Sequence, residues 1–156
     1  MDRFRVPRRE QPVRFVLDDG RTVEAEMFAA VTGPDGLPGR VLDRLNDTSE
    51  EFLPVRAGSD RFLLAKSGIV AVEVGGSPSE VTGLDPGAGH QVAVRVGLAG
   101  GTGLVGRLLV VMPPERSRVV DFMNAAGRFF PLLGEGRATL VQTRYVVSVR
   151  EMEPDA

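Results

Sequence analysis

The chain has 156 residues, of which 42% are hydrophobic and 26% are charged, and its formal net charge is −2. This balance is typical of a globular protein, because a disordered chain would have fewer apolar residues and a larger net charge. The small negative charge gives no overall attraction to nucleic acid or to an anionic membrane. Since the chain has no cysteine, disulfides, thiolate metal sites and cysteine nucleophiles are excluded.

No stretch of the sequence predicts a membrane span or a secretory signal. The longest apolar run, residues 108–112, is far shorter than the ~20 residues that a transmembrane helix needs. Residues 1–14 alternate arginine with proline and acidic residues, and they contain no apolar core of the kind that a signal peptide has. We therefore expect a cytoplasmic protein.

The first part of the chain predicts an arginine-rich arm, residues 1–11, followed by a β-rich unit over residues 12–74. Strands are predicted on both sides of Asp19-Gly20, because glycine supplies the positive φ that a tight hairpin needs. A loop rich in Gly and Pro then leads to a short helix whose apolar residues share one face. The predicted elements are strands at 13–17, 22–31, 52–56 and 63–74 and a helix at 40–46.

Residues 75–90 are rich in glycine, proline and serine, which predicts a flexible linker. A second β unit over residues 91–151 and a C-terminal tail, residues 152–156, complete the predicted organisation. The predicted elements of the second unit are strands at 91–98, 104–112, 128–133 and 138–151 and a helix at 118–124. Both units therefore have the order strand, strand, helix, strand, strand.

The two units match each other at positions that keep the same order, with only two small changes of loop length. The shared motif is a helix with Arg, Asp, an apolar anchor and Asn, followed by a phenylalanine and a proline. Its members are Arg40, Asp43, Leu45, Asn46, Phe52 and Pro54 in the first unit and Arg118, Asp121, Met123, Asn124, Phe129 and Pro131 in the second. So many ordered matches predict two diverged copies of one β unit.

These observations together predict a mainly β (α+β) fold of two tandem ββαββ repeats, which form small barrel-like units related by a pseudo-twofold axis. A four-stranded unit of about 60 residues buries little surface by itself, so the repeats are expected to share one core or to abut as two barrels. Leu45 and Met123 are expected to anchor their helices in the core. Asn46 is expected to end its helix in the left-handed conformation.

Two features resemble functional motifs but have simpler structural interpretations. The glycines of residues 101–106 have the spacing of a dinucleotide-binding motif, which requires a strand before it and a helix after it. The aligned residues of the first unit form a hairpin turn, so a turn is predicted here as well. His90, the only histidine, lies among glycines at the end of the linker, where nothing organises it for catalysis or metal binding. We predict no catalytic residue, cofactor or metal ion.

The repeated carboxylates and the arginine arm each allow a functional interpretation. Asp43 and Asp121 either face each other across a pseudo-twofold axis and bind a cation or share a proton, or bond backbone N–H groups near their helix starts, with the arginine three residues earlier pairing with the aspartate or with solvent. We favour the second interpretation. Arg5, Arg8 and Arg9 are possible contacts for an anion, although a solvated arm is the default interpretation of such a charge cluster.

The motif Arg-x-x-Asp-x-x-Asn, followed by Phe-Leu/Phe-Pro-Val/Leu and a strand ending in Ile/Val-Val-x-Val, resembles that of a bacterial family of uncharacterised domains that often occur in tandem. The resemblance covers residues 13–74 and 94–150. It implies a small β domain of unknown function, with no catalytic residues to carry over.

The function expected from the sequence is a non-enzymatic interaction or scaffold module that binds a protein or another copy of itself. One alternative is a binder of a small anionic ligand or of nucleic acid through the arginine arm. Nucleic acid is not the expected partner, because the chain has no tryptophan, one tyrosine, and phenylalanines mostly at core-like positions, so stacking platforms are missing. A second alternative is an enzyme with a site between the two units.

Overall fold

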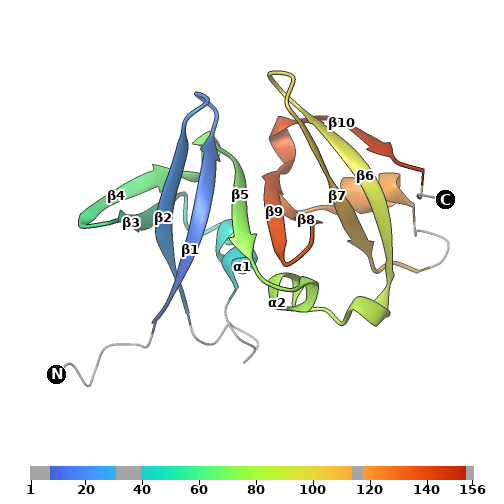
Figure 1. The fold of residues 1–156 in the computed structure, drawn as a ribbon, viewed down its shortest axis with the longest axis horizontal. Coiled ribbons are helices and arrows are strands. Elements are labelled where there is room, and N and C mark those ends of the chain that lie inside the picture. Colours follow the sequence, from blue (N-terminus) through green and yellow to red (C-terminus); the bar gives the residue numbers. More distant parts are fainter. Residues whose placement is uncertain (1–7, 31–39, 114–117, 154–156) are drawn as a thin grey trace.

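The computed structural model describes residues 8–30, 40–113 and 118–153, and within these ranges ten strands form one antiparallel sheet (Figure 1). The first half of the chain provides β1 (Arg8–Leu17), β2 (Thr22–Ala30), β3 (Phe52–Ala57), β4 (Asp60–Ala65) and β5 (Ile69–Gly75). The second half provides β6 (His90–Leu98), β7 (Gly103–Val110), β8 (Phe129–Leu133), β9 (Arg137–Gln142) and β10 (Val146–Glu151). The α-helices of these ranges are α1 (Val41–Asn46), α2 (Pro78–Thr82) and α3 (Val119–Ala125). The predicted mainly β class is confirmed.

The sheet runs in the order β10-β6-β7-β8-β9-β5-β1-β2-β3-β4. Each half keeps its own five strands together, and the pair β5–β9 joins the halves, with Val72 opposite Leu140. The sheet stays open, with β10 and β4 at its two ends. The prediction of closed barrels is therefore not met. A twofold relation would bring the same strand of each half to the junction, whereas the junction pairs two different strands.

The number of strands per half was predicted wrongly, for the same reason in both halves. Residues 63–74 and 138–151 were each predicted as one strand, but a single 3-10 turn, η1 (Lys66–Gly68) or η4 (Thr143–Tyr145), divides each of them into two. After the turn, β5 pairs with β1 and β10 pairs with β6. Because the residues on both sides of each turn are largely apolar, hydrophobic periodicity gave no sign of the break.

The predicted arm and linker are partly regular structure. Residues 8–11 belong to β1 and pair with residues 27–30 of β2. In the linker, Ser77 and Glu80 form a capping box that starts α2, and Gly83 ends this helix in the left-handed conformation. The 3-10 turn η2 (Pro86–Ala88) follows this helix, and β6 begins at His90, two residues after the turn ends. The connection between the halves is therefore an ordered segment over most of its length.

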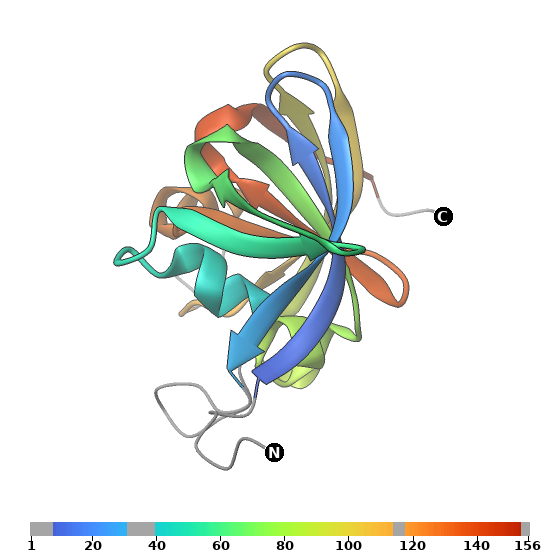
Figure 2. The ribbon, with the colours of Figure 1, turned by 90° about the vertical axis from the view of Figure 1, so that its left-hand side faces the viewer.

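Two apolar clusters lie against the sheet, and the first is built from both halves. It contains Phe15, Met27, Leu45 and Ile69 from the first half together with Leu109, Phe129, Leu133, Ala138 and Leu140 from the second. The second cluster consists of second-half residues, and Val70 of β5 packs against it. The halves thus exchange apolar residues at the junction. Figures 1 and 2 show that the β1–β2 and β6–β7 hairpins extend toward the same end of the molecule.

The two repeated helices are buried to different degrees. Leu45 in α1 is fully buried, as the sequence predicted, whereas Met123 in α3 is only half-buried and α3 has no fully buried residue. Asn46 ends α1, as predicted, but not in the left-handed conformation, because only glycines have a positive φ among the described residues. Asn46 is the last residue of α1, with ordinary backbone geometry, and its side chain has a different role, described below.

The glycine-rich segment after β6 is the hairpin turn that the sequence predicted. Gly100 and Gly101 have φ values of 94° and 95°, a region that glycine occupies without steric cost. Gly106, farther along in β7, is required by close packing, since a Cβ atom there would lie 2.8 Å from the carbonyl oxygen of Leu133. The glycines therefore serve the hairpin and the approach of β8.

The burial of Leu45 generates a test of the core. We expect Leu45→Ala to lower the free energy of unfolding by about 2–5 kcal/mol, because it removes a buried side chain and leaves a cavity. Val120, on the exposed side of α3, is the control, and Val120→Ala is expected to change stability by less than about 0.5 kcal/mol. Chemical denaturation of both variants measures the difference. Equal effects would contradict the described packing of α1.

Candidate functional site

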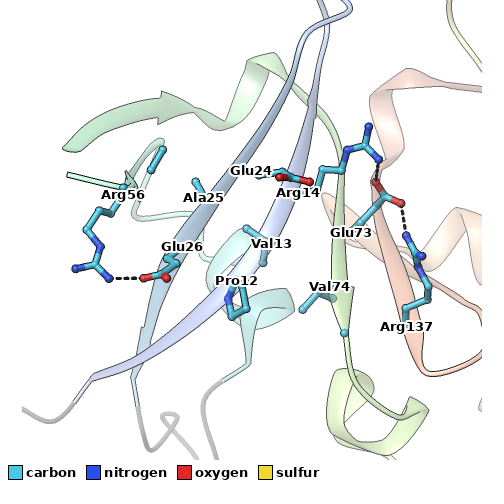
Figure 3. Close-up of a pocket in the computed structure, with 13 residues that line it drawn as sticks. Pro12, Val13, Arg14, Glu24, Ala25, Glu26, Arg56, Glu73, Val74 and Arg137 are labelled. Atoms are coloured by element: carbon cyan, nitrogen blue, oxygen red, sulfur yellow. Dashed lines mark hydrogen bonds and ion pairs between the residues drawn. The ribbon is translucent and has the colours of Figure 1, made fainter. Parts of the chain in front are cut away.

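An open groove of about 640 Å³ crosses β1, β2 and β5 (Figure 3). Its charged lining consists of three arginines and three glutamates, namely Arg14, Arg56, Arg137, Glu24, Glu26 and Glu73. The other lining residues are apolar or small, namely Pro12, Val13, Ala25, Ala57, Gly58, Val74 and Gly75. Among these described residues the positive and negative charges are equal in number, so the groove has no net charge to attract an ion.

The arginines of the groove are paired with glutamates. The Glu73 carboxylate accepts a hydrogen bond from Arg137 at 2.8 Å, and its other oxygen lies 3.4 Å from Arg14 Nη1. Glu73 therefore bridges the two sides of the junction. Arg56 pairs with Glu26 and, at 2.8 Å, with Glu10. The hydrogen bond from Arg56 lowers the pKa of Glu26, which keeps this carboxylate ionised. An anionic ligand would have to displace these carboxylates from the arginines.

The second candidate region is the junction between the halves, where Asn46 binds the backbone of β8. Its Oδ1 atom accepts a hydrogen bond from the Phe129 N–H at 2.7 Å, and its Nδ2 atom donates to the Phe129 carbonyl oxygen at 3.1 Å. One side chain at the end of α1 therefore satisfies both backbone groups of a residue in the other half. This is the structural role of the motif asparagine in the first half.

Gln142 and Lys66 are the two fully buried polar side chains of the described residues, and both lie at this junction. Gln142 Nε2 donates to the carbonyl oxygens of Lys66 and Ile69, at 2.9 and 2.6 Å. Lys66 Nζ donates to the carbonyl oxygens of Arg44 and Asp47, both at 2.8 Å, and so satisfies the C-terminal end of α1. Burial lowers the pKa of the Lys66 ammonium group.

Further contacts tie the outer side of the junction. Arg128 donates to Glu51 of the first half at 2.8 Å and, through Nε, to Gln142 at 2.8 Å. The hydrogen bond from Arg128 lowers the pKa of Glu51. The Tyr145 hydroxyl group donates to the Ser67 carbonyl oxygen in η1. The hydrogen bonds of Arg128 and Tyr145 thus connect the two halves of the chain.

The repeated Arg and Asp residues pair within their own helices. Arg40 Nη2 lies 3.1 Å from Asp43, and Arg118 Nε lies 2.9 Å from Asp121. Each carboxylate is thus engaged by the arginine three residues before it, at the start of its helix. The hypothesis that the two aspartates form one cation site gains no support, because the described ranges hold no cluster of three or more His, Cys, Asp or Glu residues placed to bind a metal ion.

Of the arginines of the predicted arm, the structure describes the backbone of two. Arg5 falls outside the described residues, and Arg8 and Arg9 begin β1, opposite Ala30 and Ala29 of β2. The structure thus does not place the three arginines of the predicted arm in one site.

The two motif prolines and the only histidine of the chain lie in strands. Pro54 in β3 lies opposite Leu63, and Pro131 in β8 lies opposite Leu140. His90 is the first residue of β6, with an exposed side chain.

Sequence reasoning named Asn46 and Phe129 as motif residues but missed Lys66, Gln142 and Tyr145, which also make the junction. Lys66 is the only lysine and Tyr145 the only tyrosine of the chain, and these single occurrences were the available signals. Neither signal could predict which residue Lys66 or Tyr145 contacts. Both side chains donate to backbone carbonyl oxygens, which every residue has. Gln142 had no signal at all, since its neighbours predict an ordinary strand.

The two ends of the sheet expose large apolar side chains. Leu63 in β4 is 63% exposed and Val147 in β10 is 72% exposed. Phe52, in the neighbouring strand β3, is 56% exposed. Edge strands of natural sheets are commonly short, charged, bulged or covered, because their unpaired backbone groups invite other strands. Both β4 and β10 have six residues and a charged pair, and β10 has a register shift between Val146 and Ser148, but their large apolar side chains stay exposed. These two edges are therefore candidate binding surfaces.

Comparisons with known proteins give no further assignment, because no protein-family model, curated protein or solved structure matches the chain. The resemblance to a tandem bacterial family stays a prediction. None of the helices in the described ranges is long and apolar enough to cross a membrane.

The Asn46 contact can be tested with a matched pair of variants. We expect Asn46→Ala to lower the free energy of unfolding by about 1–3 kcal/mol, because it leaves the backbone groups of Phe129 without their partner. Asn124, the aligned residue in α3, is exposed, and Asn124→Ala is expected to leave the stability of the dilute protein within about 0.5 kcal/mol of the original. Denaturation at low protein concentration compares the two. Equal losses would contradict the described junction.

Proposed function

We propose that this chain is a non-enzymatic protein-interaction module that binds a partner at the open edges of its sheet. The observation that carries this proposal is the exposure of Leu63 on β4 and Val147 on β10, at the two strands that end the sheet. An added strand gains backbone hydrogen bonds along such an edge, while exposed side chains select the partner.

The composition of the two edges supports binding by strand addition. The sequences are Asp-Arg-Phe-Leu-Leu-Ala in β4 and Val-Val-Ser-Val-Arg-Glu in β10. β4 has three consecutive apolar residues, Phe62 to Leu64, and β10 has three valines interrupted by Ser148, and each strand has an oppositely charged pair at one end. The apolar residues provide contact area for an added strand, and the charged pairs would fix the register in which that strand pairs.

We also infer that the two halves are diverged copies of one unit, each with five strands, one short α-helix and a 3-10 turn before its last strand. Support comes from the sequence matches and from a constant spacing of elements. β8, β9, η4 and β10 begin at Phe129, Arg137, Thr143 and Val146, each 77 residues after the start of β3, β4, η1 and β5. The strand orders β5-β1-β2-β3-β4 and β10-β6-β7-β8-β9 also correspond. In a module built from two such units, the free end strands β10 and β4 are the counterparts of β5 and β9, which pair at the internal junction.

The alternative functions have less support. The arginine arm that would bind an anion lies partly outside the described residues, and the groove arginines do not replace it, because they are paired with glutamates, as Arg137 is with Glu73. An enzyme with a site between the halves needs reactive groups there, yet Gln142 and Lys66 are engaged with backbone carbonyl oxygens. Both regions are better suited to holding the fold.

In-cell photo-crosslinking tests the proposed function. A photoreactive amino acid at position 63 or 147 is expected to give covalent protein adducts in cells that produce the chain, because these positions lie on the binding edges. Arg21, exposed in the β1–β2 turn, is the control position and is expected to give none above background. Adduct yields no higher at 63 and 147 than at 21 would contradict binding at the edges, whatever the partner is.

A further inference from the structure

We propose that the partner at these edges is a second copy of the same chain, which adds head to tail by pairing its β4 with β10. This inference rests on the proposed function and on the correspondence of the two halves. It assigns a specific occupant to surfaces that the proposed function leaves open.

The order of strands makes the two free edges complementary. Inside the chain, the last strand of the first half, β5, pairs with the fourth strand of the second half, β9. The free edges are the last strand of the second half, β10, and the fourth strand of the first half, β4. They lie at opposite ends of the molecule in Figure 1. A second copy can therefore repeat the internal junction between chains.

Apolar side chains that the internal junction buries have exposed counterparts at the free edge. Leu140 and Phe129 are 0% and 1% exposed, because they pack in the core cluster that the first half dominates. Their counterparts 77 residues earlier, Leu63 and Phe52, are 63% and 56% exposed. Equivalent apolar residues are thus buried in the second half and exposed in the first. This difference is expected if a second copy of the chain buries Leu63 and Phe52.

The opposite side of the junction shows the same difference. Val70 in β5 reaches across the junction and packs against the second-half core. Its counterpart in β10 is Val147, which is 72% exposed. In a head-to-tail assembly, Val147 would pack against the first-half core of the next copy. Burial of apolar surface on both sides of the contact would stabilise the assembly.

The two residues of the ion pair that crosses the internal junction have oppositely charged counterparts at the free edges. The acidic and the basic residue have changed strands. Glu73 of β5 accepts a hydrogen bond from Arg137 of β9 at 2.8 Å. The corresponding residues of β10 and β4 are Arg150 and Asp60, so the acid and the base have changed places. An unrelated pair of edges would have no reason to keep opposite charges at these two positions, and such complementarity fixes register.

The asparagine contact has a counterpart as well. Asn46 binds both backbone groups of Phe129 across the internal junction. The aligned asparagine, Asn124, is exposed at α3, and the residue corresponding to Phe129 is Phe52 at the start of β3. We expect Asn124 to bind the backbone of Phe52 in the next copy. This assigns an intermolecular role to the motif asparagine of the second half.

The expected register follows from the internal one. Val72 lies opposite Leu140 and Val74 opposite Ala138 in the internal pair. Shifting each strand to its counterpart places Val149 opposite Leu63 and Glu151 opposite Arg61 of the next copy. Because the contact joins two different surfaces, each added copy leaves a new free edge, and the assembly continues until it closes into a ring or grows as a filament.

A charge exchange in the full-length chain tests the contact. Asp60→Arg and Arg150→Glu each place like charges at the proposed contact, and each is expected to weaken association at least about tenfold. The double variant restores opposite charges and is expected to restore association. Sedimentation velocity over a concentration series measures the mass, which for the original chain is expected to rise above the 16.8 kDa monomer. Thermal unfolding of each dilute variant confirms that it folds.

Several results of this experiment would overturn the proposal. They are a constant mass of 16.8 kDa up to the highest soluble concentration, association unchanged by either single variant, or no recovery in the double variant. If photo-crosslinking at positions 63 and 147 captures other proteins while the pure chain stays monomeric, self-association fails and the proposed function stands. If it captures nothing, both fail.

Disulfide coupling locates the contact independently, because the chain has no cysteine of its own. Chains with Arg61→Cys and chains with Glu151→Cys are mixed and oxidised, and a dimer containing one chain of each kind is expected. Val105→Cys, at a 59% exposed position of β7, replaces either partner in the control mixtures and is expected to couple poorly. Coupling as efficient in the control mixtures, or between identical chains, would overturn the proposed register.

Discussion

Strand β5 has a hydrogen-bonded neighbour on each side, β1 from its own half and β9 from the other half. The rest of the structure depends on this pairing. It turns two five-stranded sets into one sheet, and it brings Leu140 beside Val72 in a shared core. By itself, a half of this size would bury a smaller fraction of its apolar surface and would be less stable. The pairing also leaves the two remaining edges, β4 and β10, without partners inside the described chain.

The polar groups at the junction explain why the two halves meet in one register. Asn46 recognises the backbone of a single residue, Phe129, and Gln142 recognises two carbonyl oxygens around η1. Buried groups of this kind are costly when unsatisfied, so a shifted register would leave them without partners. Apolar packing alone tolerates small shifts much better. The junction therefore combines apolar burial with hydrogen bonds that fix its geometry.

Much of the local structure followed from the sequence, because it depends on local chemistry. The mainly β class, the hairpin turns at Gly20 and Gly101, the two short helices and the burial of Leu45 could be predicted from pattern and turn residues. The 3-10 turn at Thr143–Tyr145 could not, since it contains no breaker residue, whereas Gly68 in the turn at Lys66–Gly68 was a signal that the prediction of one long strand did not use. The candidate site was not predictable either.

The missed residues share one property, which is that they act between distant parts of the chain. Gln142 and Lys66 bond to backbone atoms, so their partners depend on the fold and not on the sequence of the partner segment. Asn46 shows the same limit, because the local rule for asparagine at a helix end predicted a left-handed cap, whereas tertiary contact gave it another role. Patterns within one segment cannot reveal which edges of two units meet.

Amide hydrogen exchange of the dilute, full-length chain tests most directly whether one open sheet joins the halves. The amides that β5 and β9 share, around Val72 and Leu140, should be protected as strongly as those of central strands such as β1 and β6. The outward amides of β4 and β10 should exchange much faster, because no strand covers them in the monomer. Exchange in β5 and β9 as fast as in β4 and β10 would show that the halves are separate, and would contradict this account.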